Sequence, residues 1–162
     1  MADLSSLQPG DAIVALRTLP RRLGAALGVL DDASEARAHR LGPEGVSAVD
    51  ILLASIATWG VLTDALRRVM LDDDPLLHPA VADRTLRALA TSVSEPSAVV
   101  LEQVASSIAD LVAVADSITG HGWARTGRSG AATYHAIDLL RDAVEVGVDA
   151  LARIERTLAS FD

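Results

Sequence analysis

Hydrophobic residues recur every three or four positions along most of the chain, which is the spacing of one face of an α-helix. The pattern predicts long helices over residues 11–30, 47–70, 96–118 and 136–160, with a short helix over residues 80–90. Four long helices of similar length have apolar faces that must be buried against one another. The sequence therefore predicts an all-α bundle of four long helices with one short extra helix.

Capping and turn residues predict where the helices begin and end. Ser47 followed by Asp50 matches a capping box, so a helix is expected to begin there. Pro20 lies inside the first periodic segment and is expected to kink or divide it. Thr133 is expected to cap the last helix, and the Gly- and Arg-rich residues 121–132 are expected to form a loop.

The 162 residues are enough for one domain with a hydrophobic core. Residues 1–10 are expected to form a flexible leader, residues 11–162 a single helical domain, and residues 31–43 a charged loop within it. The first ten residues do not have the basic and apolar regions of a signal peptide. The most apolar run, residues 51–62, is too short to cross a bilayer. We therefore predict a cytoplasmic protein with no membrane partner.

Composition removes several kinds of chemistry. The chain has no cysteine and no lysine, which excludes disulfides, thiolate ligands and Schiff-base catalysis. Its net charge is −8 and it has no basic cluster, which argues against a nucleic-acid partner. Only 2% of residues are aromatic, so the core is expected to consist of aliphatic side chains in close-packed helices. All fourteen basic residues are arginine and asparagine is absent, a bias typical of a GC-rich bacterial genome.

The last predicted helix has two chemically different faces. Its charged residues form one stripe at helical spacing, which we interpret as a solvated face: Asp138, Asp142, Glu145, Asp149, Arg153 and Arg156. Val146 and Ala150, one turn apart, lie on the opposite, apolar face and are expected to point inward.

Several segments, in this order and spacing, match a known family. They are Leu19-Pro20-Arg21-Arg22-Leu23, Gly45 to Asp50, the acidic Asp72 to Pro79, Gly122 to Gly127 with Thr133, Asp138 to Arg141, and Leu151 to Ile154. Through them the chain resembles the DinB-like superfamily of four-helix bundles, which includes bacterial thiol-dependent S-transferases and mycothiol-dependent maleylpyruvate isomerases. The resemblance implies an up-down-down-up topology, with a long crossover that the region from Met70 to Pro96, including the short helix, would supply.

Metal-binding members of that superfamily use three histidines, whose positions the resemblance places at Ala54, Val146 and Ala150. None of these side chains has a lone pair for a metal ion. The four histidines of the chain fall in predicted loops or helix ends, and no two have metal-ligand spacing: His39, His78, His121 and His135. We therefore predict no metal site and no cofactor.

Three further residues are candidates for binding at the mouth of the bundle. Trp123 is expected to pack its loop onto the bundle end, and Arg125 to pair with an acid such as Asp138. The functional alternative makes Arg125 a clamp for an anion. His135 is expected to be exposed, with a catalytic base as the alternative.

The small residues Ala54, Gly147 and Ala150 indicate either close helix packing, which we favour, or a cavity at the former metal site. The function predicted from the sequence is that of a degenerate, metal-free DinB-like bundle that binds a small apolar or anionic molecule or a protein. A homodimer through the apolar helices is expected. The alternatives are an enzyme, namely a thiol-dependent S-transferase or isomerase rebuilt around Glu145, Asp149 and His135, and an unrelated helical bundle.

Overall fold

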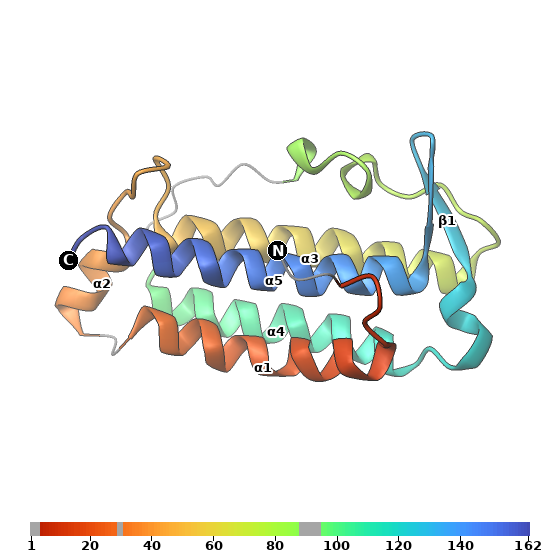
Figure 1. Cartoon of the computed structure of the whole chain (residues 1–162), viewed down its shortest axis with the longest axis horizontal. Helices are drawn as coiled ribbons and strands as arrows, with labels where there is room; N and C mark the ends of the chain where they lie inside the picture. Colours follow the sequence, from red (N-terminus) through yellow and green to blue (C-terminus); the bar gives the residue numbers. More distant parts are fainter. Residues whose placement is uncertain (1–3, 29–30, 88–94) are drawn as a thin grey trace.

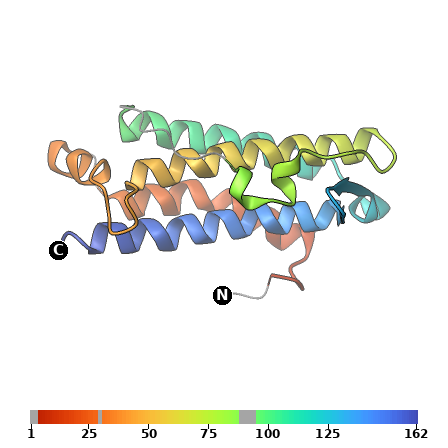
Figure 2. The same ribbon diagram turned by 90° about the horizontal axis from the view of Figure 1, so that it is seen from above.

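Four long helices lie side by side as a bundle in the computed structural model, which describes residues 4–28, 31–87 and 95–162 (Figure 1). They are α1 (Pro9–Leu27), α3 (Ala48–Leu71), α4 (Ser97–Asp116) and α5 (Ala136–Ala159). Helices α1 and α5 run in one direction and α3 and α4 in the other, as Figures 1 and 2 show. Each of the pair α1 and α3 packs against both α4 and α5. This arrangement confirms the predicted all-α, up-down-down-up bundle.

Short elements occupy the two ends of the bundle and the long crossover. Helix α2 (Asp32–Ala38) lies at one end. The 3-10 turn η3 (Gly120–Ala124) and the antiparallel strands β1 (Thr126–Ser129) and β2 (Ala132–His135) lie at the other. The crossover between α3 and α4 contains the 3-10 turns η1 (Pro79–Val81) and η2 (Arg84–Leu86). These two turns lie over the α3–α5 side of the bundle (Figures 1 and 2).

Helix α1 continues through Pro20 as one helix, so the expected division into two was wrong. It begins at Pro9, two residues earlier than predicted, and five of its side chains are buried in the bundle. Tertiary burial of this kind outweighs the local cost of an interior proline. The predicted leader is also not loose throughout, because Leu4 and Leu7 pack against the core and Arg141 Nε donates to the Leu7 carbonyl at 3.0 Å.

Three local predictions were wrong. Residues 31–43 include helix α2, which Asp31 caps by accepting from the Ser34 amide at 2.7 Å. Residues 121–132 contain η3, β1 and the start of β2 rather than a loop. Over residues 80–87 the predicted short helix is replaced by the two 3-10 turns, and residues 88–90 lie outside the described part. Each of these segments is shaped by contacts with the bundle that a local pattern does not contain.

The predicted capping box at the start of α3 is confirmed: Asp50 N donates to Ser47 Oγ at 3.1 Å and Ser47 N to Asp50 Oδ2 at 2.9 Å. Helix α5, in contrast, begins after His135 rather than after the predicted Thr133. The His135 amide donates to Asp138 Oδ2 at 3.0 Å, whereas Thr133 belongs to β2. The hairpin therefore delivers the chain directly into α5.

By length and composition, α3 and α4 could each cross a membrane, although the apolar run at residues 51–62 alone is too short. Of the most apolar window of α3, 61% is buried inside the bundle. Trp59 of this helix is fully buried, and its Nε1 donates to the Ala143 carbonyl of α5 at 3.0 Å. The interior of a helical bundle therefore accounts for the apolar character of α3.

Helix α2 is joined to the start of α4 through Glu35. The Glu35 carboxylate accepts hydrogen bonds from the amide (2.9 Å) and the hydroxyl of Ser97, and His39 Nε2 lies 2.9 Å from the same carboxylate. The Ser97 hydroxyl, and then the Ser97 amide and His39, hold the pKa of Glu35 below its usual range. A carboxylate at a helix N-terminus stabilises the free amides there.

Glu35→Gln is expected to lower the free energy of unfolding by about 1 kcal/mol near neutral pH, a modest value because a third of the side chain is exposed. A folded-state pKa below the unfolded value of 4.5 means that the stabilisation is present above that pH and is lost as the pH falls through the folded pKa. Urea titrations between neutral and acidic pH should therefore show the two proteins converging. The exposed Glu155→Gln is the control, and a difference that grows on acidification would contradict this account.

Candidate functional site

A groove of about 640 Å³ runs between α3 and α5, beneath the crossover. Ala54, Val146 and Ala150 all line it, so the three positions taken from the family resemblance lie at one place. Ile51, Ser55 and Thr58 of α3 complete the inner wall. The Ser55 and Thr58 hydroxyls donate to carbonyls of their own helix, at 2.8 and 2.9 Å. The wall thus consists of apolar groups and of hydroxyl oxygens that can still accept a hydrogen bond.

The small residues of this region serve two purposes. At Gly147, α5 approaches α1 so closely that a Cβ atom would lie 2.2 Å from Leu19 Cδ1. At Ala54 and Ala150, on the opposite side, the groove remains open. Close packing, the favoured prediction, is therefore correct for Gly147 and wrong for Ala54 and Ala150, which line the groove.

Four arginines line the outer part of the groove, all of them paired with carboxylates: Arg84 and Arg87 of the crossover, and Arg153 and Arg156 of α5. The charged stripe of α5 consequently faces the crossover and the loop before α3. It is not the simple solvated face that its spacing indicates.

Arg87 holds the crossover onto α5. Its side chain is 9% exposed and its Nη2 lies 2.5 Å from Asp142 Oδ2, with Nη1 at 3.2 Å from the other oxygen. Its Nε and Nη2 also donate to the carbonyls of Ala80 and Val81, at 2.9 and 3.1 Å. With its donors used in this way, Arg87 is a structural part of the groove wall.

Arg84 is more accessible, with 58% of its side chain exposed. Its Nη2 contacts Glu145 Oε2 at 2.7 Å and Asp142 Oδ1 at 3.1 Å. The hydrogen bond from Arg84 lowers the pKa of Glu145 and raises the pKa of Arg84. A carboxylate with a lowered pKa is a weak base near neutral pH, so this geometry does not suit Glu145 for general-base catalysis.

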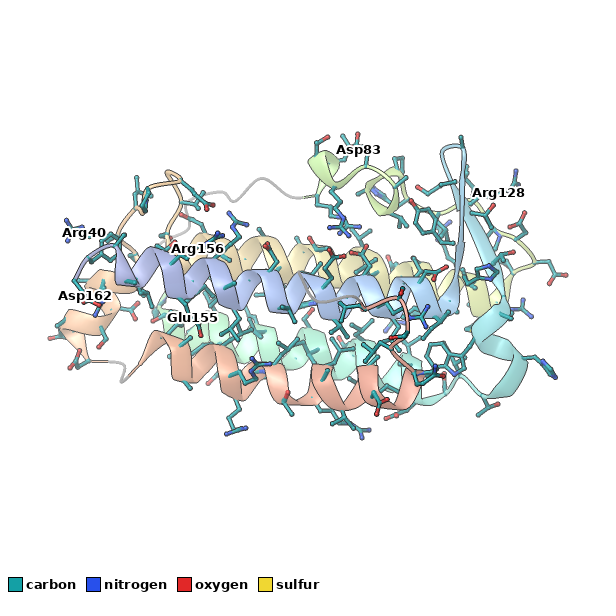
Figure 3. The ribbon with its side chains drawn as sticks, in the orientation of Figure 1. Arg40, Asp83, Arg128, Glu155, Arg156 and Asp162 are labelled. Carbon is teal, nitrogen blue, oxygen red and sulfur yellow. The ribbon has the colours of Figure 1, made fainter. Side chains whose placement is uncertain are left out.

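Glu44, on the loop before α3, forms ion pairs with the other two arginines, Arg153 and Arg156. Its Oε2 accepts from Arg153 Nε at 3.2 Å and Nη2 at 3.1 Å, and its Oε1 lies 3.7 Å from Arg156 Nη2. Arg156 projects from the C-terminal part of α5 with 68% of its side chain exposed (Figure 3). A carboxylate is therefore already bound at this end of the groove.

The residues present do not fit the three-histidine metal of the superfamily. Ala54, Val146 and Ala150 supply no donor atom to the groove. Among residues 4–28, 31–87 and 95–162, no three histidine, aspartate or glutamate side chains gather closely enough to hold a metal ion. His39 instead contacts Glu35, and His78 Nδ1 accepts from the Ala80 amide at 3.1 Å.

Trp123, Arg125 and His135 lie at the hairpin end of the bundle, away from the groove. Arg125 donates from Nε to the Val69 carbonyl at 2.7 Å and from Nη2 to the Asp72 carbonyl at 2.9 Å. It therefore stabilises the C-terminus of α3, and the predicted partner Asp138 was wrong, since the acid beside Arg125 is Asp73, at 3.3 Å. Because its Nε and Nη2 donors already bind these carbonyls, Arg125 is poorly placed to bind an anion.

Trp123 packs against the hydrophobic core, as predicted, and His135 is exposed, as predicted. His135 Nδ1 lies 3.1 Å from the Ala124 carbonyl. Ten residues of helix, about 15 Å, separate His135 from Glu145, so the two do not share a site. A catalytic site rebuilt from Glu145, Asp149 and His135 is not supported by this placement.

The arginines of the crossover were missed as site residues. Arg84 and Arg87 stand three residues apart, and each pairs with the acidic stripe of α5. Asp142 and Glu145 are also three residues apart, and this equal spacing was a signal in the sequence that the two pairs could meet. Nothing local, however, indicates which face of the bundle the crossover covers.

No protein-family model and no curated protein sequence matches the chain. Among solved structures the chain is similar to YfiT from Bacillus subtilis, described as a probable metal-dependent hydrolase with an unusual four-helix bundle topology. The two have a TM-score of 0.72 at 13% sequence identity, over 98% of this chain and 92% of that chain. At this identity the similarity shows the fold alone: the chain is a four-helix bundle with the topology of that protein.

Proposed function

We propose that this protein binds a small anionic molecule with an apolar body in the α3–α5 groove, without the three-histidine metal that the DinB-like resemblance implies. The observation that supports this proposal is the composition of the groove, whose inner wall is apolar and whose outer edge has four arginines. Apolar pockets with a few charged groups at their edge bind and orient amphipathic ligands.

The two ends of the rim would act differently on such a ligand. Arg153 and Arg156 already hold one carboxylate, that of Glu44, so their spacing suits a carboxylate, sulfonate or phosphate group. Arg84 can turn toward a ligand because more than half of it is exposed, whereas the buried Arg87 keeps the wall in place. The apolar part of the ligand would lie against Ala54, Val146 and Ala150.

The probe 8-anilinonaphthalene-1-sulfonate combines an aromatic body with one anionic group, and its fluorescence rises in an apolar site. We expect saturable binding at one site per chain. Arg153→Gln should weaken binding about tenfold, because a charge-assisted hydrogen bond contributes about 1.5 kcal/mol or more. Ala54→Phe, which fills the inner wall, should weaken it at least as much. Arg67→Gln, an exposed arginine of α3 outside the groove, is the matched control.

Glu44→Gln should strengthen binding of the same probe, because it removes the carboxylate that competes for Arg153 and Arg156. A probe that binds wild type and Ala54→Phe equally would lie elsewhere on the surface and would contradict the proposal. Retention of the wild-type helical circular dichroism would show that each variant is folded.

A further inference from the structure

Helix α4 is more apolar than α3 but much less buried. Only 33% of its most apolar window is buried, against 61% in α3, although its mean hydropathy is higher. The side chains left outside the core include Val99, 41% exposed, and the alanines Ala105, Ala109 and Ala113. Burial inside a single bundle explains the apolar character of α3, but it does not explain why the outer face of α4 is apolar.

The exposed part of α4 adjoins α1, on the side of the bundle opposite the crossover (Figures 1 and 2). A shallow groove of about 330 Å³ lies between the two helices, lined by Arg17 and Pro20 of α1 and by Ala105, Ala109 and Ala113 of α4. Alanines at a spacing of four form a flat ridge on a helix, which allows another helix to approach closely.

Charges of opposite sign flank this ridge on the two helices. Glu102 and Asp110 of α4 and Arg21 of α1 are exposed, and none of them forms an ion pair with a side chain of the described residues. Arg17 already pairs with Asp116 across the groove at 2.6 Å, so charges of the two helices attract each other on this face. The surface therefore carries an acidic helix beside a basic one, which is a self-complementary pattern.

We propose that the α1–α4 face binds a second copy of this chain to form a two-fold dimer. In this dimer the alanine ridge of each α4 lies in the α1–α4 groove of the other protomer. The acidic residues Glu102 and Asp110 of one protomer then face Arg21 of the other. The same acids oppose the alternative that this face rests on a membrane, since acidic side chains are repelled by an anionic lipid surface. The inference is independent of the ligand groove, which is lined by α3 and α5, on the other side of the bundle from the α1–α4 face (Figure 1).

Sedimentation velocity and light scattering over a range of concentrations test the proposal. Wild type should be dimeric, and Ala109→Arg should raise the dissociation constant about tenfold or more by placing a long charged side chain on the ridge. Ala152→Arg, an exposed alanine of α5, is the matched control and should leave the dimer intact.

A charge reversal tests the pairing itself. Arg21→Glu should weaken the dimer, as should Glu102→Arg combined with Asp110→Arg. The variant with all three substitutions should restore it, because every attraction is then present in reversed form. A monomeric wild type at every concentration would overturn the proposal, as would a dimer insensitive to Ala109→Arg. Co-sedimentation of a monomeric wild type with phosphatidylcholine vesicles would assign the face to lipid and would equally overturn it.

Discussion

Replacing Ala54, Val146 and Ala150 together by histidine is expected to produce a chain that binds one Zn²⁺ or Ni²⁺ ion. All three positions line the same groove, two of them one turn apart on α5 and the third on α3. Three imidazoles from facing helices, with a fourth position left to water, form the usual open coordination of a bound transition metal. We expect affinity to rise by about three orders of magnitude or more over the single Ala54→His variant, since one imidazole alone binds weakly.

Calorimetric titration of each purified protein with zinc, followed by elemental analysis after dialysis, measures this change. The proteins must be free of a polyhistidine tag, which would bind the same metals. A triple variant that keeps its helical circular dichroism and retains no metal would show that the family positions were assigned to the wrong residues. The result bears on the proposed function too, because it would support placing the groove at the metal position that the DinB-like resemblance implies.

Asp142→Ala is expected to lower the free energy of unfolding by about 3 kcal/mol, the largest loss for any single charged residue of the site. Asp142 is 16% exposed and binds both Arg84 and Arg87, whose side chain is only 9% exposed. Its removal leaves the Arg87 guanidinium without a counter-charge inside the crossover contact. An unpaired buried charge costs far more than a lost surface pair.

Glu145→Ala provides the comparison within the same network. Its partner Arg84 is 58% exposed, so we expect a loss of less than about 1 kcal/mol. Urea unfolding of the two variants beside wild type measures both values. Equal losses would mean that the crossover is held mainly by contacts other than the Arg87–Asp142 pair.

The homodimer, the cytoplasmic location and the bacterial origin stay predictions, and the dimer has its own test above. The division into a leader and one domain also stays a prediction, with the reservation that Leu4 and Leu7 already pack on the bundle. The residues proposed for a thiol-dependent transferase or isomerase do not form a shared site. His135 is the N-cap of α5, at one end of the helix, whereas Glu145 binds Arg84.

The sequence by itself determined the four helices, their approximate limits and their inward faces. Helical periodicity is local, and the capping box of Ser47 and Asp50 can be recognised within four residues. The inward direction of Ala150 followed from the same periodicity. The family resemblance, not periodicity, supplied the three metal-ligand positions, and they stay a prediction. The low aromatic content correctly favoured an aliphatic, helical core.

Only the tertiary structure decided what the charged and special residues do. Pro20 stays helical because five α1 side chains are buried, Arg125 serves carbonyls of α3, and the stripe of α5 meets arginines from the crossover. Each outcome depends on residues distant in sequence, whose approach is fixed by how the helices pack. Periodicity specifies which face of a helix turns inward, but the partner of a polar side chain depends on which element the fold brings against it.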